Sequence, residues 1–237
     1  MLHSHTIIKK WKRFINSDNS VSVTGFYNRL DGEWDLHIGE MLNFELGSNF
    51  FGIVSNYNYT PKDFNINVGL SANTYNRTHS SVGIPSFEID SYTNKGTKNE
   101  VSSYAKAEWT LGNFTLFGDT QLRHVVFKYD GNVALDNQDW SFFNPKAGLT
   151  YNLNKSNKFY GSVGKSHREP TRSDMFGGED DLITFNEVTP EEVLDYEIGY
   201  NLTKSNFVLN VITGKSFFLA YLSSFIQPSL LAQPSNS

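Results

Sequence analysis

Apolar and polar residues alternate along most of this chain in segments of about ten residues, the pattern of β-strands with one apolar face. Short polar turns separate some segments, at residues 59–63, 111–114, 152–157 and 203–206. Long polar stretches separate others, at roughly residues 76–99, 128–141 and 167–191. The two kinds of connection alternate, so we predict antiparallel strands with short turns at one end of the sheet and long loops at the other.

Four hairpins follow from this pattern. In the first, Pro61 and Lys62 form a two-residue turn that pairs Tyr59 with Phe64. That register also predicts the pairs Tyr57–Ile66, Ser55–Val68, Ile53–Leu70, Asn58–Asn65 and Asn56–Asn67. The second turns at Gly112-Asn113 and places Lys106 opposite Asp119, a favourable pair of charges. The third and fourth cover residues 143–166 and 193–212.

The ends of the chain are less regular. Residues 1–20 are poorly patterned, and we expect two strands between Val21 and Leu46 that turn at Asp31-Gly32. Alternation fades after residue 212, so residues 213–237 are predicted to be an irregular tail that results from a truncation or a change of frame. The strand-rich region is therefore predicted to span residues 21–212. No signal peptide is recognisable at the N-terminus, which suggests a piece of a longer protein.

Composition narrows the class of fold. Only 38% of residues are hydrophobic, the mean hydropathy is −0.41, and no apolar run is long enough for a transmembrane helix. A transmembrane β-barrel fits these values, because only every second residue of its strands touches lipid. Aromatic residues make up 15% of the chain, and several would form an interfacial girdle near the short turns: Tyr57, Tyr59, Trp109, Phe114, Tyr151, Phe159, Tyr200 and Phe207.

Charge and cysteine content exclude some functions. The net charge of −5 and the lack of a basic stripe argue against nucleic-acid binding. The chain has no cysteine, which rules out disulfides and cysteine metal sites. No nucleophile–base pair, metal motif or phosphate loop is present, so we expect no enzymatic activity, no metal site and no cofactor.

Four segments resemble the barrel domain of TonB-dependent outer-membrane receptors, in particular those of Bacteroidetes-type bacteria. They are residues 116–124 (LFGDTQLRH), 142–151 (FFNPKAGLTY), 160–172 (YGSVGKSHREPTR) and 189–200 (TPEEVLDYEIGY). The resemblance implies about 8–10 strands of a larger, 22-stranded barrel in the outer membrane of a Gram-negative cell. It also implies uptake of scarce nutrients such as iron–siderophore complexes or cobalamin, with outer-membrane lipid, TonB and a plug domain missing from this chain as partners.

Two other functions stay open at this point. The chain could be a small, complete outer-membrane barrel with an adhesive or structural role, or a soluble carbohydrate-binding β-sandwich. A sandwich would place a second sheet against the apolar faces that we assign to lipid.

Candidate site residues fall into two groups. Arg168 and Arg172, with Glu169, would lie at a loop mouth, where they could meet an anionic ligand such as a metal chelate. Alternatively, these residues would orient the loop through salt bridges. Charged residues on the polar faces would point into the barrel lumen, where they would pair with one another or contact the plug. These are Lys106, Glu108, Asp119, Arg123, Lys146, Asp195 and Glu197.

Overall fold

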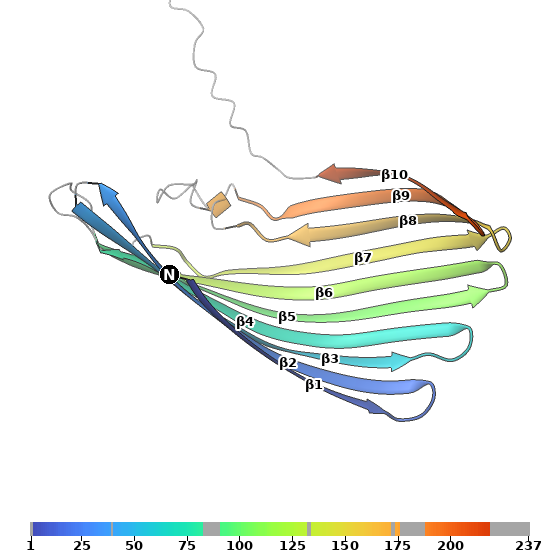
Figure 1. The fold of residues 1–237 in the computed structure, drawn as a ribbon, viewed down its shortest axis with the longest axis horizontal. Coiled ribbons are helices and arrows are strands. Elements are labelled where there is room, and N and C mark those ends of the chain that lie inside the picture. The colour runs from blue at the N-terminus through green and yellow to red at the C-terminus, as the bar shows by residue number, and fades with distance from the viewer. Residues whose placement is uncertain are drawn as a thin grey trace, which may run out of the picture.

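The computed structural model describes residues 2–38, 40–82, 91–131, 134–171, 174–175 and 188–218. Ten strands form one antiparallel sheet in which every strand pairs with its neighbours in the sequence, in the order β1 to β10 (Figure 1). The strands are β1 (Leu2–Phe14), β2 (Asn19–Ile38), β3 (Glu40–Tyr59), β4 (Phe64–Val82), β5 (Tyr92–Leu111), β6 (Phe114–Asp130), β7 (Gln138–Asn152), β8 (Asn157–Arg168), β9 (Glu191–Lys204) and β10 (Phe207–Phe218). In the described residues β1 and β10 do not pair with each other, so the sheet is open.

The short turns lie together at one end of the sheet, as the sequence predicted (Figure 1). Backbone hydrogen bonds of 2.8 Å join each turn to the next, from the amides of Thr60, Thr110, Asn152 and Thr203 to the carbonyls of Asp18, Asp63, Asn113 and Ser156. A fifth short turn, between β1 and β2, lies in the N-terminal segment that showed no clear pattern. The longer connections, between β4 and β5, β6 and β7, and β8 and β9, are at the opposite end.

Two predicted turns have different outcomes. The turn at Gly112-Asn113 is confirmed, with Leu111 opposite Phe114 and Gly112 at a φ of 58°, a left-handed conformation that glycine adopts without strain. The register at Pro61-Lys62 is wrong by two residues, because Tyr59 pairs with Ile66. Two-residue hairpin turns need a positive φ at their first central position, and the proline ring fixes φ near −65°. A shift of two residues leaves every side chain on its predicted face.

The strands are longer than the ten residues that a bilayer requires, and β2, β3 and β5 each have 20. The predicted turn at Asp31-Gly32 is wrong: both residues lie inside β2, opposite Gly47 and Leu46 of β3. The predicted loops 76–99 and 128–141 are likewise partly strand, because β4, β5, β6 and β7 extend into them. At the other boundary, β10 continues past residue 212 to Phe218.

The distribution of apolar side chains between the two faces of the sheet changes along the strands. We call the face that carries Tyr104 and Arg123 the inner face, and the opposite one the outer face. Near the short turns the outer face is apolar and exposed, with Ile53, Leu70, Val101, Trp109, Leu116, Leu122, Leu149 and Ile198 all at least 40% accessible. Near the long loops, the aromatic residues are on the inner face instead, including Phe44, Phe50, Tyr75, Phe127, Tyr129 and Trp140. Where the apolar positions move from one face to the other, the regular alternation of apolar and polar residues in the sequence is interrupted. The far halves of these strands were predicted to be loops for this reason.

Four cross-strand pairs on the inner face place an aromatic ring directly against a glycine. The pairs are Phe26–Gly52, Tyr104–Gly69, Phe117–Gly148 and Tyr160–Gly199. In each pair a Cβ added to the glycine would lie 2.0–2.6 Å from the ring. Such a ring occupies the space that a side chain at the glycine would fill, and it covers the backbone there. These glycines therefore leave room for the bulky rings to pack against the backbone of the inner face.

Candidate functional site: the inner wall and its cavity

All seven charged residues predicted to face a lumen lie on the inner face. Register places Lys106, Asp119, Lys146 and Asp195 in a single row across β5 to β9, with Gly164 between the last two. The predicted opposition of Lys106 and Asp119 is confirmed. Asp119 lies between Lys106 and Lys146, and this alternation of charge favours the observed register over its neighbours. That this face lines the lumen of a closed barrel remains a prediction.

Farther from the short turns, the inner face holds a cavity of about 730 Å³. Its aromatic lining consists of Phe50, Tyr75, Phe127, Tyr129 and Trp140. Its charged lining consists of Arg77, Lys98, Glu100, Arg168 and Glu169. An apolar lining with a few converging charged groups is the usual make-up of a small-molecule site.

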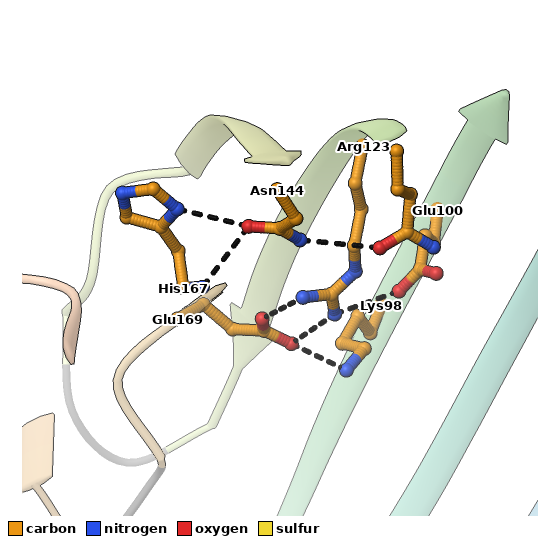
Figure 2. Close-up of polar contacts among 7 residues, drawn as sticks. Lys98, Glu100, Arg123, Asn144, His167 and Glu169 are labelled. Carbon is orange, nitrogen blue, oxygen red and sulfur yellow. Dashed lines mark hydrogen bonds and ion pairs between the residues drawn. The ribbon is translucent and has the colours of Figure 1, made fainter. Parts of the chain in front are cut away.

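Lys98, Glu100 and Glu169 line this cavity, and together with Arg123 behind them they form a network of four charged residues (Figure 2). Arg123 binds both carboxylate oxygens of Glu169, at 2.8 Å and 2.9 Å. It also contacts Glu100 at 2.8 Å, and Lys98 donates to Glu169 at 2.6 Å. The side chains of Arg123 and Glu169 are only 16% and 10% exposed. Removing one partner from a buried ion pair of this kind leaves an uncompensated charge and is strongly destabilising.

Burial by itself raises the pKa of Glu169, but the hydrogen bonds from Lys98 and Arg123 outweigh it and lower the pKa from 4.5 to about 2. The carboxylate is therefore ionised at neutral pH. With two cations and two carboxylates, the network as a whole is electrically neutral.

A proline in β7 explains how Glu169 reaches the inner wall. The β7–β8 ladder stops at the pair Lys146–Gly164, next to Pro145, which cannot donate a backbone hydrogen bond. Beyond this point Asn144 replaces the ladder: its Oδ1 accepts from the His167 amide at 3.0 Å and lies 2.9 Å from His167 Nδ1 (Figure 2). Glu169 follows two residues later.

The segment after Glu169 is held by a local cap. The Thr171 amide and hydroxyl both donate to Asp174 Oδ2 at 2.7 Å, and the Asp174 amide donates back to Thr171 Oγ1 at 3.3 Å. This reciprocal arrangement is that of a capping box. It places Met175, which is 2% exposed, in the cavity lining.

The structure adds residues that sequence reasoning did not select. Arg168 does line the cavity, where it forms an ion pair with Glu191 at 2.6 Å, and Arg172 lies outside the described residues. Glu169 was expected beside Arg168 at the loop mouth, and it also lines the cavity, whereas Lys98 was not selected from the sequence. No sequence signal relates Glu169 to Lys98, because 71 positions separate them.

In the described ranges, no group of three or more His, Asp or Glu residues is placed to hold a metal ion. The same part of the chain contains no helix long and apolar enough to cross a membrane.

An outer face of apolar side chains, an inner face of charges, and short turns at one end define a section of wall from a transmembrane β-barrel. The family model for the TonB dependent receptor-like β-barrel matches residues 6–236. The chain belongs to this family. No curated protein sequence matches it.

Three solved structures share this fold at low sequence identity. The copper transporter OprC superposes with a TM-score of 0.78 at 12% identity, over 91% of this chain and 39% of that one. The ferric citrate transporter FecA gives 0.70 at 14% identity, over 91% and 34%. The ferric yersiniabactin uptake receptor FyuA from Yersinia pestis gives 0.69 at 14% identity, over 92% and 35%. This chain thus spans about two fifths or less of these proteins.

The family and the single sheet decide between the functions left open above. A β-sandwich would need a second sheet packed on the apolar outer face, and the described strands all belong to one sheet whose outer residues are exposed. The carbohydrate-binding sandwich is therefore wrong. The chain is a piece of a receptor barrel, as the resemblance implied.

Proposed function

We propose that this chain forms part of an outer-membrane receptor that takes up a small metal chelate, bound in the cavity of the inner wall. The observation that carries the proposal is the 730 Å³ cavity, in which aromatic residues and cations converge on the face opposite the lipid-facing band. Its volume falls in the range of small-molecule sites. Flat apolar rings and fixed positive charges would suit the organic, anionic shell of a metal chelate.

The position of the cavity fits a receptor that works from outside the cell. The exposed apolar band lies in the half of the sheet near the short turns, which are periplasmic in barrels of this type. The cavity lies in the other half, beside the longer connections, so a ligand would meet it before the membrane. We place the chain in the outer membrane of a Gram-negative cell on this basis.

Energy for uptake would come from TonB through a plug domain carried outside these 237 residues. The inner-face row of Lys106, Asp119, Lys146 and Asp195 offers alternating charges to such a plug. We propose transport without catalysis, with neither a resident metal nor a cofactor. The transported metal would arrive inside its chelate.

Uptake by cells that carry the intact protein tests this function. Radiolabelled ferric citrate, a ferric catecholate and copper serve as probes, because the structural neighbours include transporters of these kinds. We expect uptake of at least one probe, abolished by a protonophore, and a loss of about tenfold or more in apparent affinity for W140A. Its matched control is W109A, which removes a tryptophan from the outer face. No uptake of any probe, or equal effects of the two variants, would refute the proposal.

A further inference from the structure

Three residues of the charged network lie on strands, and the fourth lies outside them. Lys98 and Glu100 are on β5 and Arg123 is on β6, each held by ladder hydrogen bonds on both sides. Glu169 is the only one of the four outside a strand, because β8 ends at Arg168. The network is therefore a rigid arrangement on the wall, to which a carboxylate from a connecting segment has been added.

The two cations of the network, Lys98 and Arg123, lie on strands, and Arg123 is held in place by contacts other than those with Glu169. Glu100 holds the Arg123 guanidinium at 2.8 Å, and the Phe142 ring lies 5.7 Å from it. Removing the Glu169 carboxylate would leave two cations against one carboxylate, a net charge of +1. Lys98, whose side chain is 35% exposed, would then present its ammonium group to the cavity.

The geometry around Glu169 is that of a bound carboxylate. Arg123 contacts both of its oxygens and Lys98 contacts one, an arrangement that would suit a free carboxylate equally well. We propose that Lys98 and Arg123 form a carboxylate-binding site in the cavity wall, that Glu169 occupies this site in the ligand-free protein, and that a carboxylate of the ligand replaces Glu169 there. The inference rests on the proposed function and deepens it, since it assigns the ligand to the carboxylate-bearing chelates.

Citrate binding to the intact receptor in detergent, measured by titration calorimetry, tests the exchange. E169Q should bind citrate about tenfold more tightly than the wild type, because no internal carboxylate competes for the two cations. The control E197Q neutralises another inner-face carboxylate, which bonds to Tyr160 at 2.6 Å away from this cavity, and should bind citrate as the wild type does. Adding K98M to E169Q should remove the gain.

Two results would overturn the inference. One is a folded E169Q whose affinity for citrate is equal to or below that of the wild type. The other is an equal gain in E197Q, which would mean that overall charge alone acts. If E169Q does not fold, E169D keeps the charge on an arm one methylene shorter; it should still bind citrate more tightly than the wild type, and unchanged binding refutes the exchange. Calorimetry does not depend on transport, so a gain in E169Q without uptake would refute only the proposed function. Uptake that depends on Trp140 without a gain in E169Q would refute only the exchange.

Discussion

The contact between Phe117 and Gly148 should make the inner wall intolerant of a single added methyl group. The Phe117 ring on β6 lies directly against Gly148 on β7, its partner in the ladder. A Cβ at Gly148 would lie 2.3 Å from Phe117 Cε1 and 2.7 Å from the carbonyl oxygen of Gly161 on β8. Both separations are well inside van der Waals contact, so G148A forces a rearrangement.

The second contact determines how much this rearrangement costs. A ring can rotate away, but the Gly161 carbonyl belongs to the backbone of β8 and can yield only if the strand moves. Overpacking that shifts backbone in this way typically costs about 1–3 kcal/mol. We expect the cost of G148A to be near the upper end of this range, because the Phe117 ring also loses its contact with the Gly148 backbone.

Urea unfolding of the intact protein in detergent, followed by heat-modifiable mobility on gels, measures this cost. The matched control is G118A, because an added Cβ on Gly118 of β6 meets nothing within 4 Å. That substitution should leave the free energy of unfolding unchanged or raise it by up to about 1 kcal/mol, since alanine loses less backbone entropy than glycine. If G148A proves as stable as G118A, the rings do not lie against the glycines as described.

Three further predictions concern charge and backbone. Glu169 has a pKa lowered from 4.5 to about 2, so its ionised form contributes about 3 kcal/mol at most to the free energy of unfolding. This contribution should be complete above pH 4.5 and lost as the pH falls toward 2. Urea unfolding of the wild type and E169Q should therefore give converging free energies over that pH interval. D119K places three cations side by side with Lys106 and Lys146, and should lower the free energy of unfolding by about 1–2 kcal/mol; D119N should cost less, and equal values would contradict the register argument. G112A should cost about 1 kcal/mol because φ is 58° there, whereas G112N should cost less; thermal melting of the two variants checks the order.

The family was readable from the sequence because its short motifs are local. Residues 160–172 and 189–200 carry it, and each is close to one strand and the start or end of its loop. The sidedness of the short turns was readable for the same reason, since a turn such as Gly112-Asn113 needs only its own residues. Local chemistry also fixed which charges share a face, because side chains alternate strictly along a strand.

The sequence by itself therefore determined the class of fold, the hairpin order, the polar faces that carry the charges, and the pairing of Lys106 with Asp119. The tertiary structure alone decided the strand lengths, the register at Pro61 and the network around Glu169. Exposed apolar side chains concentrate on the outer face near the short turns, whereas several aromatic residues near the long loops lie on the inner face, so the far halves could not be recognised by one alternating pattern. Glu169 meets Lys98 across 71 positions only because β5 to β8 curve into one wall and Pro145 ends the ladder beside them. Contacts of that kind depend on how strands assemble, which no single segment encodes.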